Sequence, residues 1–199
     1  MAINLIVRAE VVDISGDTPT GSDIYLVDTN VWFWTAYAKA SVSSSYQSGY
    51  DAYLKKALGA GSRLYVSGLS QSELIHQIEE TEREIFSVTV RRKEFRHNHP
   101  AQRASVVTEA TAAWAVVQNI ASTIDLRVDQ GMTARVITRF QSCAMDGYDL
   151  ISAEAMIEHG IPHVLTDDGD FAGVPDIVLF TANRNVLRAA GAQGKLVVR

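Results

Sequence analysis

Carboxylate side chains follow several of the strand-like segments of this chain. The apolar segment IYLV at 24–27 leads directly into Asp28, and the segment HVLT at 163–166 leads into a group of three acids. Carboxylates repel one another and resist burial, so acids clustered without a neutralising partner raise one another's pKa values. The candidate site residues among the acids are Asp28, Glu73, Asp146, Asp149, Asp167, Asp168 and Asp170.

Clustered carboxylates without cysteine or histidine favour hard cations that prefer oxygen ligands, so they indicate Mg²⁺ or Mn²⁺ rather than zinc. Magnesium usually keeps several water molecules and binds through a few carboxylates together with a substrate phosphate. A site of this kind can activate water and stabilise the leaving oxygen in phosphodiester hydrolysis. The acids therefore point to metal-dependent hydrolysis of a phosphodiester.

Each acid also has a structural interpretation when it is considered alone. An aspartate that follows a strand often caps the next helix, and this applies to Asp28 and Asp149. Glu73 follows Ser70 by three positions, and the sequence SQSE matches a capping box. Caps account for single acids. Four acid positions at one edge of a sheet are better explained by a cation site.

Strand-like and helix-like segments alternate along the chain. Helices are expected at 32–40, 51–61, 70–95, 101–122, 133–144 and 148–160, and residues 41–50 form either a loop or a helix start. Strands are expected at 4–14 (an edge strand), 24–28, 63–68, 161–167, 176–180 and 195–198. This alternation predicts a parallel sheet in a layered α/β fold. Ligands bind beyond the carboxyl ends of the strands in such a sheet, which is where the acids fall.

The overall composition suits one globular domain of 199 residues. No apolar segment approaches the roughly 20 residues that span a membrane, and no signal peptide pattern opens the chain. Cys143 is the only cysteine, so no intrachain disulfide can form, which fits a cytoplasmic location. The net charge of −5 disfavours non-specific binding to nucleic acid.

The order of the acidic motifs resembles the PIN-domain ribonucleases, including toxins of the VapC type. The resemblance rests on LVDTNVW, on the glutamate of SQSELI and on YDLISAEAMIEHGIPHVLTDDGDF, and it covers roughly residues 24–80 and 146–180. It implies a single domain with a three-layer α/β/α fold around a central parallel sheet. Residues 1–23 would be an N-terminal extension, and about 80–145 would be an additional helical middle region.

The resemblance also assigns roles by position. The catalytic and metal-binding acids would be Asp28, Glu73, Asp149 and Asp168, with Asp170 as a further metal ligand and with Thr29, Asn30, Asp146, Thr166 and Asp167 as supporting groups. It implies an endoribonuclease that depends on Mg²⁺ or Mn²⁺ and leaves a 5′-phosphate. It further implies the toxin of a toxin–antitoxin pair, with an antitoxin protein as partner, and a homodimer.

One basic cluster, RRKEFRHNH at 91–99, has two interpretations. It is either a solvated helix face balanced by the acids of EETERE upstream, or a patch that contacts RNA phosphates. A straight helix from Glu73 would place the cluster roughly 30 Å from that residue. The candidate RNA-binding residues are Arg91, Arg92, Lys93 and Arg96.

Two other functions remain open on the sequence. A phosphatase of the haloacid dehalogenase type needs a second aspartate two positions after its nucleophilic aspartate, but position 30 is Asn30. A catalytically silent PIN-like scaffold that binds RNA or protein would not need all four acids. A metal titration would distinguish the scaffold from the enzyme.

Overall fold

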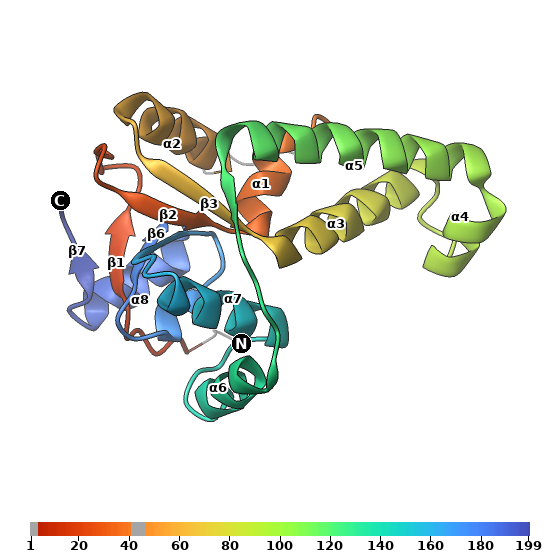
Figure 1. Ribbon diagram of the computed structural model, residues 1–199. Helices are drawn as coiled ribbons and strands as arrows, with labels where there is room; N and C mark the ends of the chain where they lie inside the picture. The colour runs from red at the N-terminus through yellow and green to blue at the C-terminus, as the bar shows by residue number, and fades with distance from the viewer. Residues whose placement is uncertain (1–3, 41–46) are drawn as a thin grey trace.

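The computed structural model describes residues 4–40 and 47–199. Its centre is a parallel sheet of seven strands in the order β4-β3-β2-β5-β6-β1-β7 (Figure 1). All neighbouring strands pair in parallel. The strands are β1 (Glu10–Asp13), β2 (Ile24–Val27), β3 (Arg63–Ser67), β4 (Ser122–Ile124), β5 (His163–Leu165), β6 (Val178–Thr181) and β7 (Leu196–Val197).

Helices cover both faces of the sheet, so the predicted three-layer α/β/α fold is confirmed. One face packs against α1 (Thr29–Ala36), α2 (Gln47–Ala60), α3 (Gly68–Phe86) and α5 (Pro100–Ile120). The other face packs against α6 (Gln130–Phe140), α7 (Gly147–Glu158) and α8 (Arg184–Ala192). The remaining elements are α4 (Arg92–Asn98) and the 3-10 helix η1 (Asp170–Gly173). Within the described ranges, no helix is long and apolar enough to cross a membrane.

The central strands β2 and β6 are largely apolar because both of their faces are buried. Successive side chains of a strand point to opposite faces. In β2, Tyr25 and Val27 join the core beneath α1, α2, α3 and α5, whereas Leu26 joins the core beneath α6, α7 and α8. In β6, Phe180 joins the core beneath α1, α2, α3 and α5, and Leu179 joins the core beneath α6, α7 and α8.

The sheet order places a topological switch point at β2. The chain proceeds from β2 to β3 and β4 on one side, whereas β5 and β6 lie on the other side. Crevices form at the carboxyl ends of the strands on either side of such a point, and they are the usual ligand sites of open α/β sheets. The residues that follow β2 and β5 therefore meet at the edge where a site is expected.

Helices α3, α4 and α5 (residues 68–120) form an arm that extends away from the sheet (Figure 1). The single helix expected over 70–95 is wrong, because α3 ends at Phe86 and the chain turns before α4 begins. The β-branched residues of the segment 88–90 have low helix propensity. The guanidinium of Arg83 also donates to the carbonyl oxygen of Val90 at 3.0 Å, which stabilises the turn after the helix.

Other predicted elements differ from the structure in position or extent. The strand expected at 4–14 is formed only by β1, and β1 is not an edge strand because it lies between β6 and β7. Neither β4 nor α8 was expected. Residues 41–46 of the ambiguous segment 41–50 lie outside the described residues, and residues 47–50 belong to α2.

Candidate active site

Asp28 follows β2 and is held by three hydrogen bonds. Its Oδ1 accepts from the backbone N–H of Thr29 at 2.7 Å, which makes it the N-cap of α1. Its Oδ2 accepts from Nδ2 of Asn30 at 2.7 Å and from Oγ1 of Thr166 at 2.5 Å. The capping interpretation of Asp28 is therefore confirmed, and the same bonds fix the direction of the carboxylate.

Glu73 lies in α3, and its Oε2 accepts a hydrogen bond from Oγ1 of Thr29 at 2.5 Å. The predicted capping box is wrong, because α3 begins at Gly68 and its N-cap is Ser67, whose hydroxyl oxygen accepts from the backbone N–H of Leu69. Ser70 lies buried within the helix. The carboxylate of Glu73 is consequently not used as a cap and turns toward the residues that follow β2.

Asp146 and Asp149, at the start of α7, have different roles in the helix. Asp146 is the N-cap, and its Oδ1 accepts from the backbone N–H groups of Tyr148 at 2.9 Å and Asp149 at 3.1 Å. Asp149 lies in the first turn of the helix. The capping role that the sequence allowed for Asp149 belongs to Asp146, so Asp149 presents a carboxylate that does not cap the helix.

The three acids after β5 separate in the structure. Asp168 lines the same cavity as Asp28, and its backbone N–H donates to Oγ1 of Thr166 at 2.8 Å. Asp167 accepts from the hydroxyl of Tyr50 at 2.9 Å, which ties it to α2. Asp170 borders a separate cavity of about 190 Å³. Of the three, the structure places Asp168 with Asp28.

The four acids proposed as catalytic line one cavity of about 650 Å³ at the carboxyl edge of the sheet. They come from four separate segments of the chain, namely the residues after β2 and β5, the second turn of α3 and the first turn of α7. The lining residues are Asp28, Thr29, Asn30, Ser72, Glu73, His76, Gln77, Asp146, Tyr148, Asp149 and Asp168.

Four of these lining residues were not candidates from the sequence: Ser72, His76, Gln77 and Tyr148. The spacing of the sequence could have indicated two of them, His76 and Gln77, because residues three and four positions apart share a face of a helix. His76 and Gln77 therefore lie on the face of α3 that carries Glu73. Tyr148 directly precedes Asp149, but adjacency alone does not indicate that a side chain lines the same cavity.

Two acids of the cavity, Asp28 and Asp149, have raised pKa values, and burial is the largest cause for both. Burial raises the pKa of Asp28 to about 6, and the charges of Asp168 and Glu73 add to the effect, whereas hydrogen bonds from Thr166 and Thr29 oppose it. Burial also raises the pKa of Asp149 to about 8, together with the charges of the surrounding acids. A divalent cation among these carboxylates would relieve both the repulsion and the cost of burial.

The residues present suit a hard cation. No three Asp, Glu, His or Cys side chains within residues 4–40 and 47–199 converge closely enough to form a complete ligand set by themselves. The four acids instead surround an open cavity, which is compatible with Mg²⁺ because this ion keeps several waters and also binds substrate phosphate. The acids that line the cavity offer carboxylate oxygens, and His76 is the one histidine among the lining residues. Carboxylate oxygens of this kind suit a hard divalent cation better than zinc.

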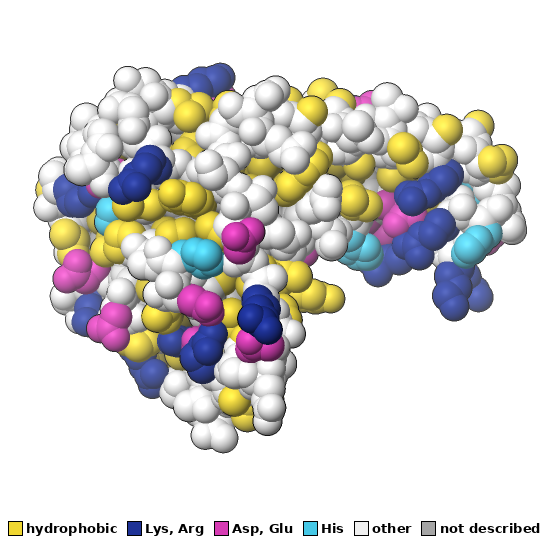
Figure 2. All heavy atoms as spheres, viewed as in Figure 1, with side chains coloured by type: hydrophobic (Ala, Val, Ile, Leu, Met, Phe, Trp, Pro, Cys, Tyr) yellow, Lys and Arg dark blue, Asp and Glu magenta, His cyan; other side chains and the backbone are white. Residues whose placement is uncertain are grey.

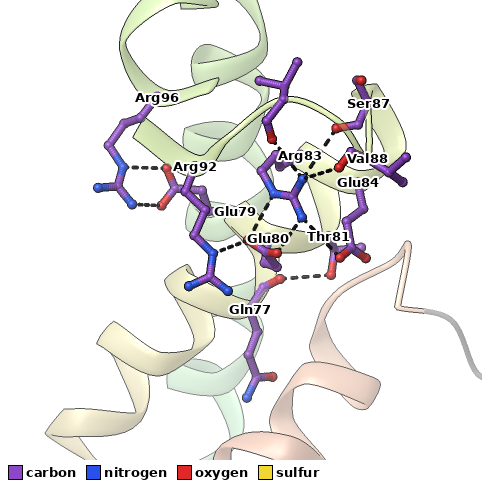
Figure 3. A network of polar contacts seen from close by, with 11 residues as sticks. Gln77, Glu79, Glu80, Thr81, Arg83, Glu84, Ser87, Val88, Arg92 and Arg96 are labelled. Carbon is purple, nitrogen blue, oxygen red and sulfur yellow. Dashed lines mark hydrogen bonds and ion pairs between the residues drawn. The ribbon is translucent and has the colours of Figure 1, made fainter. Parts of the chain in front are cut away.

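The basic cluster lies at the far end of the arm, where Lys and Arg side chains gather (Figure 2). Two of its arginines form ion pairs with α3 (Figure 3). Arg92 donates to Glu80 at 2.8 Å, and Arg96 donates to both carboxylate oxygens of Glu79 at 2.7 Å. This pairing is the arrangement that the solvated-face interpretation expects for these two residues.

The fold also brings the basic cluster closer to the acids than a straight helix would. Arg96 contacts Glu79, which follows Glu73 by six residues or about 9 Å along α3. The estimate of roughly 30 Å is therefore wrong, because the turn after Phe86 folds α4 back along α3. Arg91 and Lys93 are exposed and form no ion pair with any residue that the structure describes.

Comparisons with known proteins place the chain in a family. A model of the PIN domain matches residues 25–177. A search of curated proteins found no match. Among solved structures, the chain is similar to VapBC2 from Rickettsia felis, which was solved bound to a promoter DNA fragment. The two chains are 15% identical with a TM-score of 0.49, and the match covers 78% of this chain and 96% of that chain. PAE2754 from Pyrobaculum aerophilum is similar at 13% identity, with 86% and 97% covered and a TM-score of 0.44.

The PIN-domain match extends from β2 to the loop before β6 and includes every acid that lines the cavity. PIN domains are generally nucleases. On the extent of this match, the chain belongs to the PIN domain family.

Proposed function

We propose that this chain is an endoribonuclease that uses Mg²⁺ or Mn²⁺ to hydrolyse phosphodiester bonds in RNA. The observation that carries the proposal is the meeting of Asp28, Glu73, Asp149 and Asp168 in one cavity at the topological switch point. Asp28 caps α1, but neither caps nor ion pairs among the described residues account for the meeting of all four carboxylates in one cavity. They suit a site where cations and a phosphodiester bind together.

In this proposal the four acids hold the cation, and neighbouring groups orient them. When bound, the cation supplies an activated water and stabilises the leaving oxygen of the phosphodiester. Asn30 and Thr166 donate to Oδ2 of Asp28 and keep its carboxylate directed into the cavity. Thr29 contributes its backbone N–H to Asp28 and its hydroxyl to Glu73, so one residue sets the relative position of two acids. The products would carry a 5′-phosphate.

The biological setting is also part of the proposal. The motifs that resemble VapC-type toxins suggest the toxin of a toxin–antitoxin pair in the cytoplasm, with an antitoxin protein that blocks the cavity, and they suggest a homodimer. The exposed cations Arg91 and Lys93 would contact RNA phosphates beyond the cavity. Arg92 and Arg96 contribute less to RNA binding in this scheme, because Glu80 and Glu79 already neutralise them.

The proposal is tested by cleavage of a 5′-labelled RNA after removal of metal. We expect no cleavage in EDTA, restored cleavage in millimolar Mg²⁺ or Mn²⁺, and products with a 5′-phosphate. RNA that binds but stays intact in every metal would support the catalytically silent scaffold instead. A burst of phosphorylated enzyme from a phosphomonoester would support the phosphatase, although position 30 is occupied by Asn30 rather than by the second aspartate.

A further inference from the structure

The wall of the cavity contains an aromatic ring that the hydrolytic chemistry does not use. Tyr148 is the second residue of α7, lines the cavity beside Asp149 and has 57% of its surface exposed. Its backbone N–H donates to the capping carboxylate of Asp146. Its ring and its hydroxyl have no ring contact or hydrogen bond with any residue in the described ranges. A ring of this kind is fixed at its base and presents its surface to whatever enters the cavity.

The opposite wall of the cavity carries two polar side chains. His76 and Gln77 lie on α3, which covers one face of the sheet, whereas Tyr148 lies on α7, which covers the other face. The side chain of Gln77 points away from the ion pairs that join α3 to α4 (Figure 3). Its amide has no hydrogen-bond partner among the residues that the structure describes. The cavity thus has an aromatic wall and a polar wall, with the acids between them.

The size of the cavity exceeds what a cation and its waters require. A water molecule occupies about 30 Å³, and sites that enclose small organic groups measure about 300–1,000 Å³. The cavity of about 650 Å³ falls within the second range. A nucleotide that places its phosphate among the acids must also place its base somewhere nearby. The aromatic wall beside Asp149 is the surface in this cavity that suits a flat apolar group.

We propose that Tyr148 stacks against the base of a nucleotide next to the scissile phosphate, and that His76 and Gln77 contact the polar edge of that base. This assignment rests on the proposed endoribonuclease function. A base in a duplex has both faces covered by its neighbours, so the base that stacks on Tyr148 must be unpaired. Stacking tolerates any base, so sequence preference arises from the polar wall.

Substitutions at position 148 test the stacking role through its dependence on an aromatic ring. Tyr148→Ala should lower kcat/KM for a single-stranded oligoribonucleotide about 5- to 150-fold, the size expected from the loss of one base–aromatic stack. Tyr148→Phe and Tyr148→Trp should stay within about threefold of the wild type, because both keep a stacking surface. Phe140→Ala is a matched control, since Phe140 is a similarly exposed aromatic residue, 60% exposed, that does not line the cavity.

A substrate without the base gives the complementary measurement. An abasic nucleotide next to the mapped cleavage site should slow the wild type by the same factor as Tyr148→Ala, and Tyr148→Ala should lose nothing further on that substrate. If Tyr148→Ala cleaves the intact oligonucleotide as well as the wild type, the assignment is wrong and the endoribonuclease function stands. If the wild type cleaves no RNA, the proposed function fails. In that case, binding of an oligonucleotide that contains the fluorescent base 2-aminopurine tests the stacking. Fluorescence quenching by the wild type that is lost in Tyr148→Ala supports the stacking role, and equal quenching by the two proteins overturns it.

Discussion

The hydroxyl of Thr29 donates a 2.5 Å hydrogen bond to Oε2 of Glu73, and this bond connects the end of β2 to the first part of α3. Thr29 is buried, with 2% of its surface exposed, whereas Glu73 is half-buried in the wall of the cavity. Since its backbone N–H also donates to Asp28, Thr29 relates the positions of two acids that lie 45 residues apart in the sequence.

Removing this hydroxyl should impair catalysis more than folding. Thr29→Val keeps the shape of the side chain but leaves Glu73 without its donor. We expect cleavage to fall about 10- to 100-fold, as for other residues that orient metal ligands, and the free energy of unfolding to fall by about 1 kcal/mol. Thr29→Ser keeps the hydroxyl and should retain most of the activity. Equal cleavage by Thr29→Val and wild type would show that the bond does not position Glu73.

Divalent cations should stabilise the native state, because the acids of the cavity repel one another without a cation. A ligand that binds only the folded chain at one hundred times its Kd adds about 2.7 kcal/mol. Thermal unfolding in millimolar Mn²⁺ should therefore show a higher Tm than unfolding in EDTA, and Asp168→Asn should reduce this shift. Asp51→Asn, which alters a half-buried acid of α2 that is paired with Lys55 and does not line the cavity, should keep the full shift. Identical Tm values in Mn²⁺ and EDTA would contradict a cation site.

A second cluster of charges predicts how stability depends on pH. Arg199 donates to Asp17 and to Asp23 at the opposite end of the strands and lies over the ring of Phe180. Burial alone would raise the pKa of Asp23, but hydrogen bonds from Arg199 and Thr20 outweigh it and lower the pKa to about 2. The usual value is 3.8, so Asp23 contributes about 2 kcal/mol of stability above that pH.

Because the folded pKa of Asp23 is the lower one, this contribution is complete above pH 3.8 and is lost as the pH falls through about 2. Arg199→Gln should therefore lower the free energy of unfolding at pH 7 and have a smaller effect near pH 2. Urea titrations at the two pH values measure the difference. Arg188→Gln, an exposed position on α8 without an ion pair among the described residues, should change neither value by more than about 0.5 kcal/mol. An equal effect of Arg199→Gln at both pH values would contradict the linkage.

The contribution of the arm to RNA binding should depend on its unpaired cations. Each neutralised phosphate of a single strand adds about −0.7 to the slope of log K against log salt. Arg91→Ala combined with Lys93→Ala should weaken binding of long RNA and reduce the magnitude of this slope by about 1.4. Cleavage of a dinucleotide, which is too short to reach α4, should not change.

Arg92→Ala is the control for the salt measurement, because Arg92 is already paired with Glu80. It should change the slope by less than about 0.7. If the double variant at positions 91 and 93 binds long RNA with unaltered affinity and slope, all of the basic cluster is a solvated helix face.

The sequence predicts the layered fold because the strand segments buried on both faces, such as IYLV and RLYVS, are apolar and separated by helices. It also predicts that Asp28, Glu73, Asp149 and Asp168 meet, since parallel strands bring residues that follow them to one edge. The three residues of β4 are too few to produce a periodic pattern, and they continue a helical segment without a break in composition. This strand can be recognised only in the structure, from its pairing with β3.

The features that sequence reasoning did not predict depend on contacts between distant segments. The turn between α3 and α4 is stabilised by Arg83, whose guanidinium reaches the carbonyl oxygens after the helix and the carboxylate of Glu80. No local pattern distinguishes that arginine from an exposed one. Tyr148 likewise meets His76 and Gln77 across the cavity only because α7 and α3 reach the same edge from opposite faces of the sheet.

The most direct test of the account is single-turnover cleavage of a labelled RNA by Asp28→Asn and Asp149→Asn in metal-depleted buffer restored with Mg²⁺. Both substitutions keep the size of the side chain and remove its charge, so the fold should persist, which far-UV circular dichroism checks, with Asp51→Asn as the control. We expect both variants to lose at least about 100-fold in cleavage rate, whereas Asp51→Asn should cleave at the wild-type rate. Wild-type cleavage by both Asp28→Asn and Asp149→Asn would contradict the account.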